Sequence, residues 1–274
     1  MNGRWICRFG MPTSVLLMAI LPSYPTTAES AEDHSHQENV RTGSNLTGET
    51  VLSKLVQHDE LRALALQQYS VDRTYLVKTD GGKLRSEAHV SMSYKAPDTK
   101  AFTVVSENGP AMIRNLVNSL LKMEAEAAIG GSTHDNSVTP ANYLFTLVGQ
   151  EEIDGSPCLV VQATPKRRDI CLFEGKVWID AKEFAIVKIA GEPAKNPSFW
   201  IKRATFVRQY QKIEGNWLPL KDETVAQVRV FGKNTLTIYH NNYQVHLRQD
   251  PAPGHSTGSL DPTRPLSFKN LVLE

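Results

Sequence analysis

The sequence from residue 84 to residue 95 alternates apolar and polar side chains, and this period of two predicts a long β-strand. Val90 and Met92 belong to the apolar set, and Glu87 and His89 belong to the polar set. Because successive side chains of a strand point to opposite faces, we expect one buried face and one wet face. Residues 72–78 and 101–106 predict a strand on either side, and turn residues divide residues 142–245 into about seven more. The chain is therefore predicted to contain about ten consecutive antiparallel strands.

Two segments repeat apolar residues at every third and fourth position, which predicts amphipathic helices. The first runs from Thr50 towards Tyr69, with Thr47 or Thr50 as its N-cap. The second runs from Ala111 to Ile129 and is followed by a pair of glycines that would end it. These helices are the only predicted elements that could cover the sheet.

The hairpin GKVWIDAKEFAIVKIAG, residues 175–191, is apolar on both of its faces. A turn centred on Lys182 would place Val177, Ile179, Ala185, Val187 and Ile189 on one face, and Trp178 and Ile186 on the other. A sandwich would bury both faces in protein, but one meander and two helices supply no second sheet. The pattern therefore favours a curved antiparallel sheet with an apolar cavity between its concave face and the helices.

Composition and the first residues place this domain in an exported protein. With 274 residues, of which 41% are hydrophobic and 22% charged, the chain can form one or two globular domains. Arg4 and Arg8 precede an apolar run at residues 15–21, which predicts a signal peptide over residues 1–28, cleaved near Ala28. That run is too short to span a bilayer. We predict a flexible lead at 29–48, one domain at 49–248, and a linker and C-terminal tail at 249–274.

Charge and motifs exclude several classes of function. Loss of Arg4 and Arg8 lowers the Lys and Arg count from 30 to 28, against 29 Asp and Glu, so nucleic acid is not an expected partner. No nucleophile elbow, phosphate-binding glycine loop or zinc motif occurs, so we expect no enzyme, no cofactor and no metal. Cys158 and Cys171 could form a disulfide or remain two separate thiols, and the sequence leaves both possibilities open.

Three stretches carry a resemblance to a known family. They are FEGKVWIDAKEFAIVKIAGEP at 173–193, SFWIKRATFVRQYQKIEGNWLPL at 198–220 and LTIYHNNYQV at 236–245. Over residues 48–246 the chain resembles periplasmic outer-membrane lipoprotein-sorting proteins, which are similar to the LolA/LolB-like lipoprotein carrier superfamily. The resemblance implies a mainly β fold with α-helices (α+β), in which a single curved antiparallel sheet forms an unclosed half β-barrel lidded by two or more helices. It also implies that the helix from Ala111 to Ile129 is a lid, and that a strand arginine, Arg73 or Arg85, binds it as a gate.

The leading hypothesis from these observations is a monomeric periplasmic carrier. Its cavity would hold the acyl chains of lipoproteins or lipids, for outer-membrane lipoprotein sorting. The predicted cavity residues are Val90, Met92, Leu116, Leu120, Phe145, Phe173, Val177, Ile179, Val187 and Ile189. The alternative is a periplasmic sensor or regulatory module that binds a membrane partner such as an anti-sigma factor, docked on the patch around Trp178 and Ile186.

Overall fold

A computed structural model describes residues 46–128, 138–196 and 198–248. The predicted signal peptide, most of the predicted lead, the glycine pair after the second helix, and the linker and tail lie outside these residues. None of the helices in the described ranges is long and apolar enough to cross a membrane.

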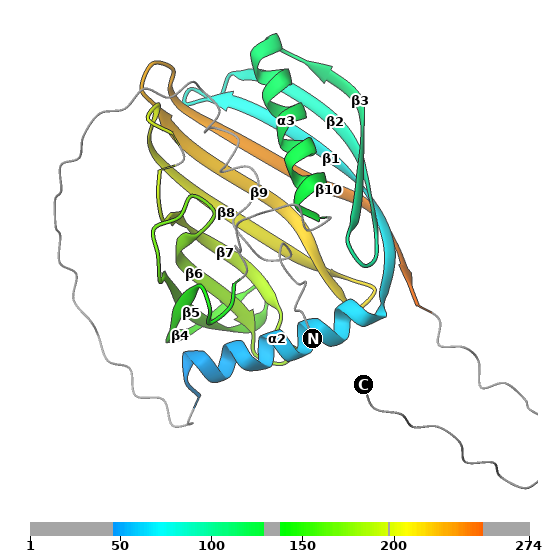
Figure 1. The fold of residues 1–274 in the computed structure, drawn as a ribbon, viewed down its shortest axis with the longest axis vertical. Helices are drawn as coiled ribbons and strands as arrows, with labels where there is room; N and C mark the ends of the chain where they lie inside the picture. Colours follow the sequence, from blue (N-terminus) through cyan, green and yellow to red (C-terminus); the bar gives the residue numbers. More distant parts are fainter. Residues whose placement is uncertain (1–45, 129–137, 197, 249–274) are drawn as a thin grey trace, which may run out of the picture.

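The described chain forms a single antiparallel sheet of ten strands and two helices, α2 (Gly48–Ala65) and α3 (Ala111–Ala128). The strands are β1 (Leu66–Thr79), β2 (Leu84–Lys95), β3 (Thr99–Asn108), β4 (Tyr143–Ile153), β5 (Ser156–Pro165), β6 (Phe173–Asp180), β7 (Ile186–Pro193), β8 (Ile201–Ile213), β9 (Asn216–Val228) and β10 (Gly232–Leu247). Their order in the sheet is β3-β2-β1-β10-β9-β8-β7-β6-β5-β4, with β3 and β4 as unpaired edges. The curved sheet does not close, and α3 crosses its inner face (Figure 1). The predicted fold class is confirmed.

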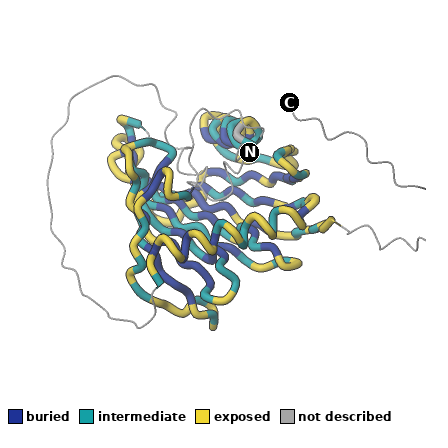
Figure 2. The backbone as a smooth tube through the Cα atoms, turned by 60° about the horizontal axis from the view of Figure 1, so that its bottom comes forward, coloured by how far each residue is buried: buried dark blue, intermediate teal, exposed yellow. Residues whose placement is uncertain are grey.

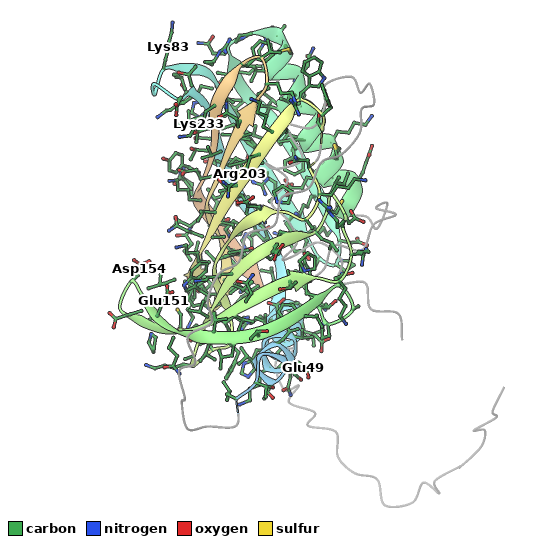
Figure 3. All side chains as sticks on the ribbon, turned by 90° about the vertical axis from the view of Figure 1, so that its left-hand side faces the viewer. Glu49, Lys83, Glu151, Asp154, Arg203 and Lys233 are labelled. Atoms are coloured by element: carbon green, nitrogen blue, oxygen red, sulfur yellow. The ribbon has the colours of Figure 1, made fainter. Side chains whose placement is uncertain are left out.

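Burial alternates along the strands as the sequence predicts. In β2 the inward positions, which include Ala88, Val90 and Met92, are buried, while the positions between them are exposed or partly exposed. A similar alternation follows β1 and β9, so that buried and exposed residues form stripes (Figure 2). In contrast, β3 has no buried residue, and β5 and β6 each contain a run of four buried residues. Charged side chains such as Lys83, Lys233 and Glu49 lie at the periphery of the sheet and on α2 (Figure 3).

Helix α2 lies across one end of the sheet. Thr47 is its N-cap, and its side chain accepts a hydrogen bond of 3.2 Å from the backbone N–H of Thr50. The prediction that this helix continues towards Tyr69 is wrong, because the chain enters β1 at Leu66. Leu66 and Tyr69 pair with Leu247 and Val245 of β10, and these ladder hydrogen bonds replace those of a longer helix.

Gly48, the first residue of α2, packs directly on the sheet. A Cβ atom at this position would lie 2.5 Å from the carbonyl oxygen of Phe145, which is backbone and cannot rotate away. We therefore expect Gly48→Ala to lower the free energy of unfolding by about 1–3 kcal/mol. Chemical denaturation would measure it. Gly81→Ala is the matched control, because nothing lies within 4 Å of its Cβ position, and it should change stability by no more than about 0.5 kcal/mol.

The hairpin of β6 and β7 corrects the predicted register. Val177 pairs with Ile189 and Gly175 with Gly191, and an irregularity follows between Trp178 and Ile179. The loop is not centred on Lys182: Phe184 adopts a positive φ of 47°, and the Asp180 carboxylate accepts from the N–H groups of Lys182 and Glu183 at 2.9 and 2.7 Å. Because one extra residue reverses the alternation beyond it, Ile186 joins Ile189 on the inner face and Val187 turns outward.

The outer face of this hairpin carries a small cluster of four buried residues, which we call the outer cluster: Cys158, Val160, Trp178 and Val187. The Trp178 indole donates a 2.7 Å hydrogen bond to Glu151, and the Lys188 ammonium lies 4.5 Å from the centre of its ring. Charged side chains thus cover the apolar surface. The expected docking patch around Trp178 and Ile186 is therefore wrong, since Ile186 is buried on the other face.

The two cysteines in the described residues form no disulfide. Cys158 is buried in the outer cluster and Cys171 is partly buried before β6. Burial raises the pKa of the Cys158 thiol, and the nearby carboxylate of Asp180 adds to this effect. Of the two possibilities that the sequence left open, the structure has separate thiols.

Candidate functional site

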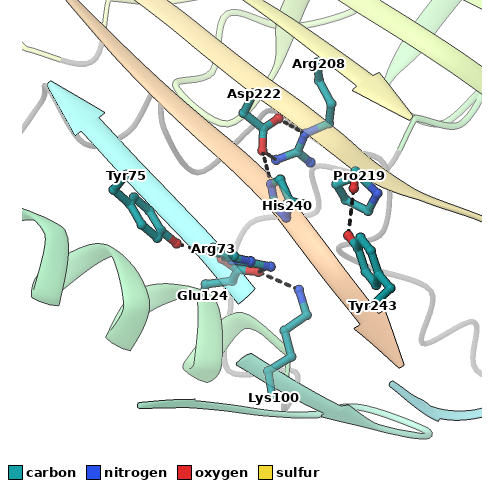
Figure 4. A network of polar contacts seen from close by, with 9 residues as sticks. All are labelled: Arg73, Tyr75, Lys100, Glu124, Arg208, Pro219, Asp222, His240 and Tyr243. Atoms are coloured by element: carbon teal, nitrogen blue, oxygen red, sulfur yellow. Dashed lines mark hydrogen bonds and ion pairs between the residues drawn. The ribbon is translucent and has the colours of Figure 1, made fainter. Parts of the chain in front are cut away.

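Ionisable side chains from three neighbouring strands meet on the inner face of the sheet, at Arg208 in β8, Asp222 in β9 and His240 in β10. Arg208 and Asp222 are directly opposite in the strand register, and their side chains form a two-point ion pair, with Nη2 of Arg208 3.1 Å from Oδ2 of Asp222. Nε2 of His240 lies 3.1 Å from the same oxygen (Figure 4). Asp222 and His240 are only 1% and 2% exposed. The carboxylate of Asp222 therefore joins three strands inside the protein.

A second group continues this network towards α3. Arg73 of β1 pairs with His240 in the register of β1 and β10, and its guanidinium donates to both carboxylate oxygens of Glu124 on α3, at 2.8 and 3.2 Å. Lys100 of β3 donates to Glu124 at 2.8 Å, and Arg73 also donates to the Tyr75 hydroxyl at 3.4 Å (Figure 4). One helix carboxylate is thus held by two cations of the sheet.

The electrostatics of these groups keep both carboxylates charged. Burial alone would raise the pKa of Glu124, but the charges of Arg73 and Lys100 outweigh that penalty and hold its pKa well below its usual value. Burial likewise opposes ionisation of Asp222, and its ion pair with Arg208 and its hydrogen bond from His240 lower its pKa. Each carboxylate of the network is therefore ion-paired, which is the condition for burying a negative charge.

His240 is the neutral member of the network near pH 7. Burial lowers its pKa, the positive charge of Arg73 lowers it further, and the hydrogen bond to Asp222 offsets this only in part. Because a carboxylate only accepts hydrogen bonds, Nε2 of His240 carries the proton that it donates to Asp222. Nδ1 is then an acceptor, and it has no partner among the described residues.

Tyrosine hydroxyls border the network. Tyr243 of β10 donates a 2.7 Å hydrogen bond to the carbonyl oxygen of Pro219, and burial raises its pKa. Burial raises the pKa of Tyr210, two residues after Arg208, to about 12. Both tyrosines therefore stay neutral, so the charge of the network comes from its carboxylates and cations alone.

Three apolar clusters surround the network on the inner face. The main inner cluster lies beneath α2 and includes Val51, Leu52, Leu55, Phe173, Val177, Ile179, Ile186, Ile189 and Phe206. The α3 cluster consists of Tyr75, Val77, Ala88, Val90, Ile113, Val117, Leu120, Leu121, Leu236 and Ile238. The third, which we call the tyrosine cluster, is built on Leu66, Val71, Met92 and Tyr94, with Tyr69 and Tyr243 against it.

The predicted cavity residues fall into these clusters and not into one group. Phe173, Val177, Ile179 and Ile189 lie in the main inner cluster, with Phe145 packed against it. Val90 and Leu120 lie in the α3 cluster, Leu116 packs against it, and Met92 lies in the tyrosine cluster. Val187 lies on the opposite face, in the outer cluster, so its predicted position is wrong. The reason is the irregular hairpin described above.

The two predicted gate residues differ in position. Arg73 is buried and bound to α3, whereas Arg85 is exposed at an outward position of β2. A hollow of about 690 Å³ lies elsewhere, at the end of β1 and β10. Gln67, Val245, His246, Leu247 and Arg248 line it, and no predicted cavity residue does. The inner face itself is covered by the two helices and by its own side chains.

Sequence reasoning missed the buried network except for Arg73. Its signal is visible in the strands: Arg208 stands between Phe206 and Tyr210, both inward residues of β8, and His240 follows inward Ile238 in β10. A charged residue at an inward strand position requires a partner. The sequence offers no way to choose that partner, since each lies on another strand or helix.

The neutral state of His240 gives a prediction for the dependence of stability on pH. The unfolded histidine, with its ordinary pKa of 6.5, takes up a proton as the pH falls below that value, while the folded one resists it. Stability is therefore expected to fall from pH 7.5 to pH 5.5, by at most about 1.4 kcal/mol per pH unit from this group. Denaturation experiments at several pH values across this range should show that the free energy of unfolding depends less steeply on pH in His240→Gln. His89→Gln, which removes an exposed imidazole, is the matched control.

The fold and the network together define a protein class: a curved antiparallel sheet whose inner face is covered by helices, one of them held by a buried ion pair. A family model described only as an uncharacterized protein matches residues 131–250. No curated protein matches the chain. Among the described residues, no three His, Cys, Asp or Glu side chains form a group that could hold a metal ion.

Several solved structures are similar to this one. A DUF1329 family protein from Desulfovibrio piger is 14% identical, with 72% of this chain and 92% of that chain covered and a TM-score of 0.39. A putative outer membrane lipoprotein-sorting protein domain from Vibrio parahaemolyticus is 11% identical, with 74% and 94% covered and a TM-score of 0.39. A LolA superfamily protein from Nitrosomonas europaea is 13% identical, with 75% and 96% covered and a TM-score of 0.36.

Proposed function

We propose that this protein is a periplasmic carrier that holds acyl chains of lipoproteins or lipids on the inner face of its sheet, for outer-membrane lipoprotein sorting. The observation that carries the proposal is the attachment of α3. The apolar side of this helix packs on Tyr75, Val90 and Leu236, and its partly buried carboxylate, Glu124, is paired with the sheet. An apolar surface is thus covered by a helix that one ion-paired group holds in place.

An acyl chain can replace the apolar contacts of α3 at little net cost in free energy. The helix buries five apolar side chains against the sheet, Ile113, Leu116, Val117, Leu120 and Leu121. At roughly 2 kcal/mol each, their burial is worth about 10 kcal/mol. Each buried methylene of an acyl chain contributes about 0.8 kcal/mol, so about a dozen methylenes supply the same amount. The apolar contributions to the exchange are therefore balanced, and the ion pair of Glu124 with the sheet favours the closed position of α3.

Arg73 is the residue that we propose as the gate. It binds Glu124 through two hydrogen bonds, and its buried position on β1 means that it moves only with the sheet. Opening of α3 would break this ion pair and expose the α3 cluster. Arg85 is exposed, and among the described residues the ion pairs of Glu124 are with Arg73 and Lys100. The carrier role requires no covalent chemistry.

Mass spectrometry under non-denaturing conditions tests the proposal. We expect the protein purified from its native host to carry acyl-chain ligands, and the ligand-free protein to bind a fluorescent fatty acid. Recovery of only empty protein that binds no fatty acid would contradict the carrier function. If a membrane regulator is recovered in a pull-down with no lipid, the sensor alternative becomes the better explanation.

A further inference from the structure

The buried network has one more positive charge than negative charge. Its cations are Arg73, Lys100 and Arg208, and its carboxylates are Glu124 and Asp222. His240 is neutral near pH 7. Asp59 of α2, which lies close enough to act on Tyr210, is paired with Arg62 at 3.6 Å and adds no net charge. Within this network of described residues, there is therefore an excess of one cation.

This excess lies away from water. The side chains of Arg73, Lys100 and Arg208 are 6%, 19% and 13% exposed. A buried charge without a counter-charge is costly, and proteins usually avoid it by pairing. An anionic group on this face would bring the total to three cations and three anions. The network is thus complementary to a ligand with one negative charge.

Two unpartnered nitrogen atoms mark where such a ligand would bind. Nε of Arg73 and Nδ1 of His240 are both buried and have no hydrogen-bond partner among the described residues. The two residues are directly opposite each other on β1 and β10, on the face that α3 covers (Figure 4). Nε of Arg73 carries a hydrogen and can donate, whereas Nδ1 of the neutral ring can accept. The pair suits a polar group that both accepts and donates hydrogen bonds.

We propose that Arg73 and His240 bind the acidic head group of an amphiphile, an oxyacid with a single negative charge. A phosphate monoester meets both requirements in its singly protonated form, which has one negative charge, with an anionic oxygen for Arg73 and a hydroxyl for His240. A carboxylate meets the first requirement. The acyl chain of the ligand would lie on one of the apolar clusters that flank the network. This inference rests on the proposed carrier function and specifies the ligand that the carrier prefers.

Ligands with the same long hydrocarbon chain and different head groups test the inference on the full-length protein. The probes are oleate and oleoyl lysophosphatidic acid as the two oxyacids, and oleyl alcohol and methyl oleate as neutral ligands. We expect the better oxyacid to bind about tenfold to a hundredfold more tightly than the neutral ligands, as one charge-assisted hydrogen bond would give. The order of the two acids tells whether the site is built for a phosphate or for a carboxylate.

Lys100→Gln gives the matched variant, because glutamine can still donate to Glu124 but removes the excess charge. The measured quantity is the ratio of acidic to neutral affinity within each variant, so any loosening of α3 cancels. We expect this ratio to fall about tenfold in Lys100→Gln and to stay unchanged in Lys188→Gln, which removes a cation of the outer face. Equal binding of acidic and neutral ligands to the wild-type protein would overturn the inference and leave the carrier function intact. Absence of binding of all four ligands would count against the carrier function itself.

Discussion

Replacing Asp222 by alanine is expected to lower the free energy of unfolding by about 3–5 kcal/mol. The substitution removes the only carboxylate that pairs with Arg208 among the described residues. It leaves this cation beside the main inner cluster without a counter-charge. It also leaves Nε2–H of His240 without its acceptor. Both effects come from leaving a buried charged or polar group without a partner, so they do not depend on how the Asp222 side chain itself packs. Urea denaturation of wild type and variant measures the effect.

Two further variants show whether the unpaired charge is the cause. In Arg208→Leu/Asp222→Leu both charges are gone, and we expect at least half of the lost stability to return, since buried ion pairs are often replaceable by apolar residues. Asp80→Ala breaks an exposed ion pair with Lys233 and should cost no more than about 1 kcal/mol. A loss in Asp222→Ala as small as that of the surface variant would show that the network contributes little.

Glu124→Gln is expected to release α3 from the sheet. Glutamine keeps the shape of the side chain but cannot neutralise Arg73 and Lys100, which then face each other's charge without a counter-ion. If the broken pair costs about 3 kcal/mol and this loss acts on the opening of α3, amide exchange in residues 111–128 should be more than a hundredfold faster. Hydrogen exchange read out by mass spectrometry measures this directly for each peptide.

The control for this experiment is Glu126→Gln, two residues further along α3. Glu126 is 62% exposed and forms only a loose contact of 4.0 Å with Lys122, so its loss should leave exchange unchanged. The pKa of Glu124 lies well below its usual value of 4.5. The stabilisation by the ion pair is therefore complete above about pH 4.5 and is lost as the pH falls through the lowered pKa. If exchange in α3 is the same in both variants, Glu124 does not hold the helix and the proposed gate is wrong.

The sequence predicts those parts of the fold that depend on local patterns. The alternation in β2 identifies a half-buried strand, and the glycine and proline before Ala111 place the start of α3 correctly. The hairpin register was not predictable, because the positive φ of Phe184 is set by the loop's own hydrogen bonds to Asp180 and not by a glycine. One irregular residue was enough to exchange the faces of Ile186 and Val187.

The candidate site was predictable only in part, for a different physical reason. Arg73 is a candidate by resemblance, but its partner Glu124 lies on α3. The sequence pattern predicts which side of this helix is apolar, and it does not predict which of its polar residues binds the sheet. Asp222 and His240 meet because β9 and β10 are neighbours, and a charged residue within a strand does not reveal whether it points outward to water or inward to a partner. Pairing across strands is a property of the assembled sheet.

The strand order has a consequence for how the chain folds. The first strand, β1, pairs with the last, β10, through contacts such as Leu66 with Leu247, and β10 joins β1–β3 to the rest of the sheet. Strands β1–β3 and strands β4–β10 can each form by successive local hairpins, but the pairing of β1 with β10 must wait until almost the whole domain is available. Such a high contact order slows folding. Until β1 and β10 pair, their facing edges stay open, and these are the segments for which a chaperone would matter most.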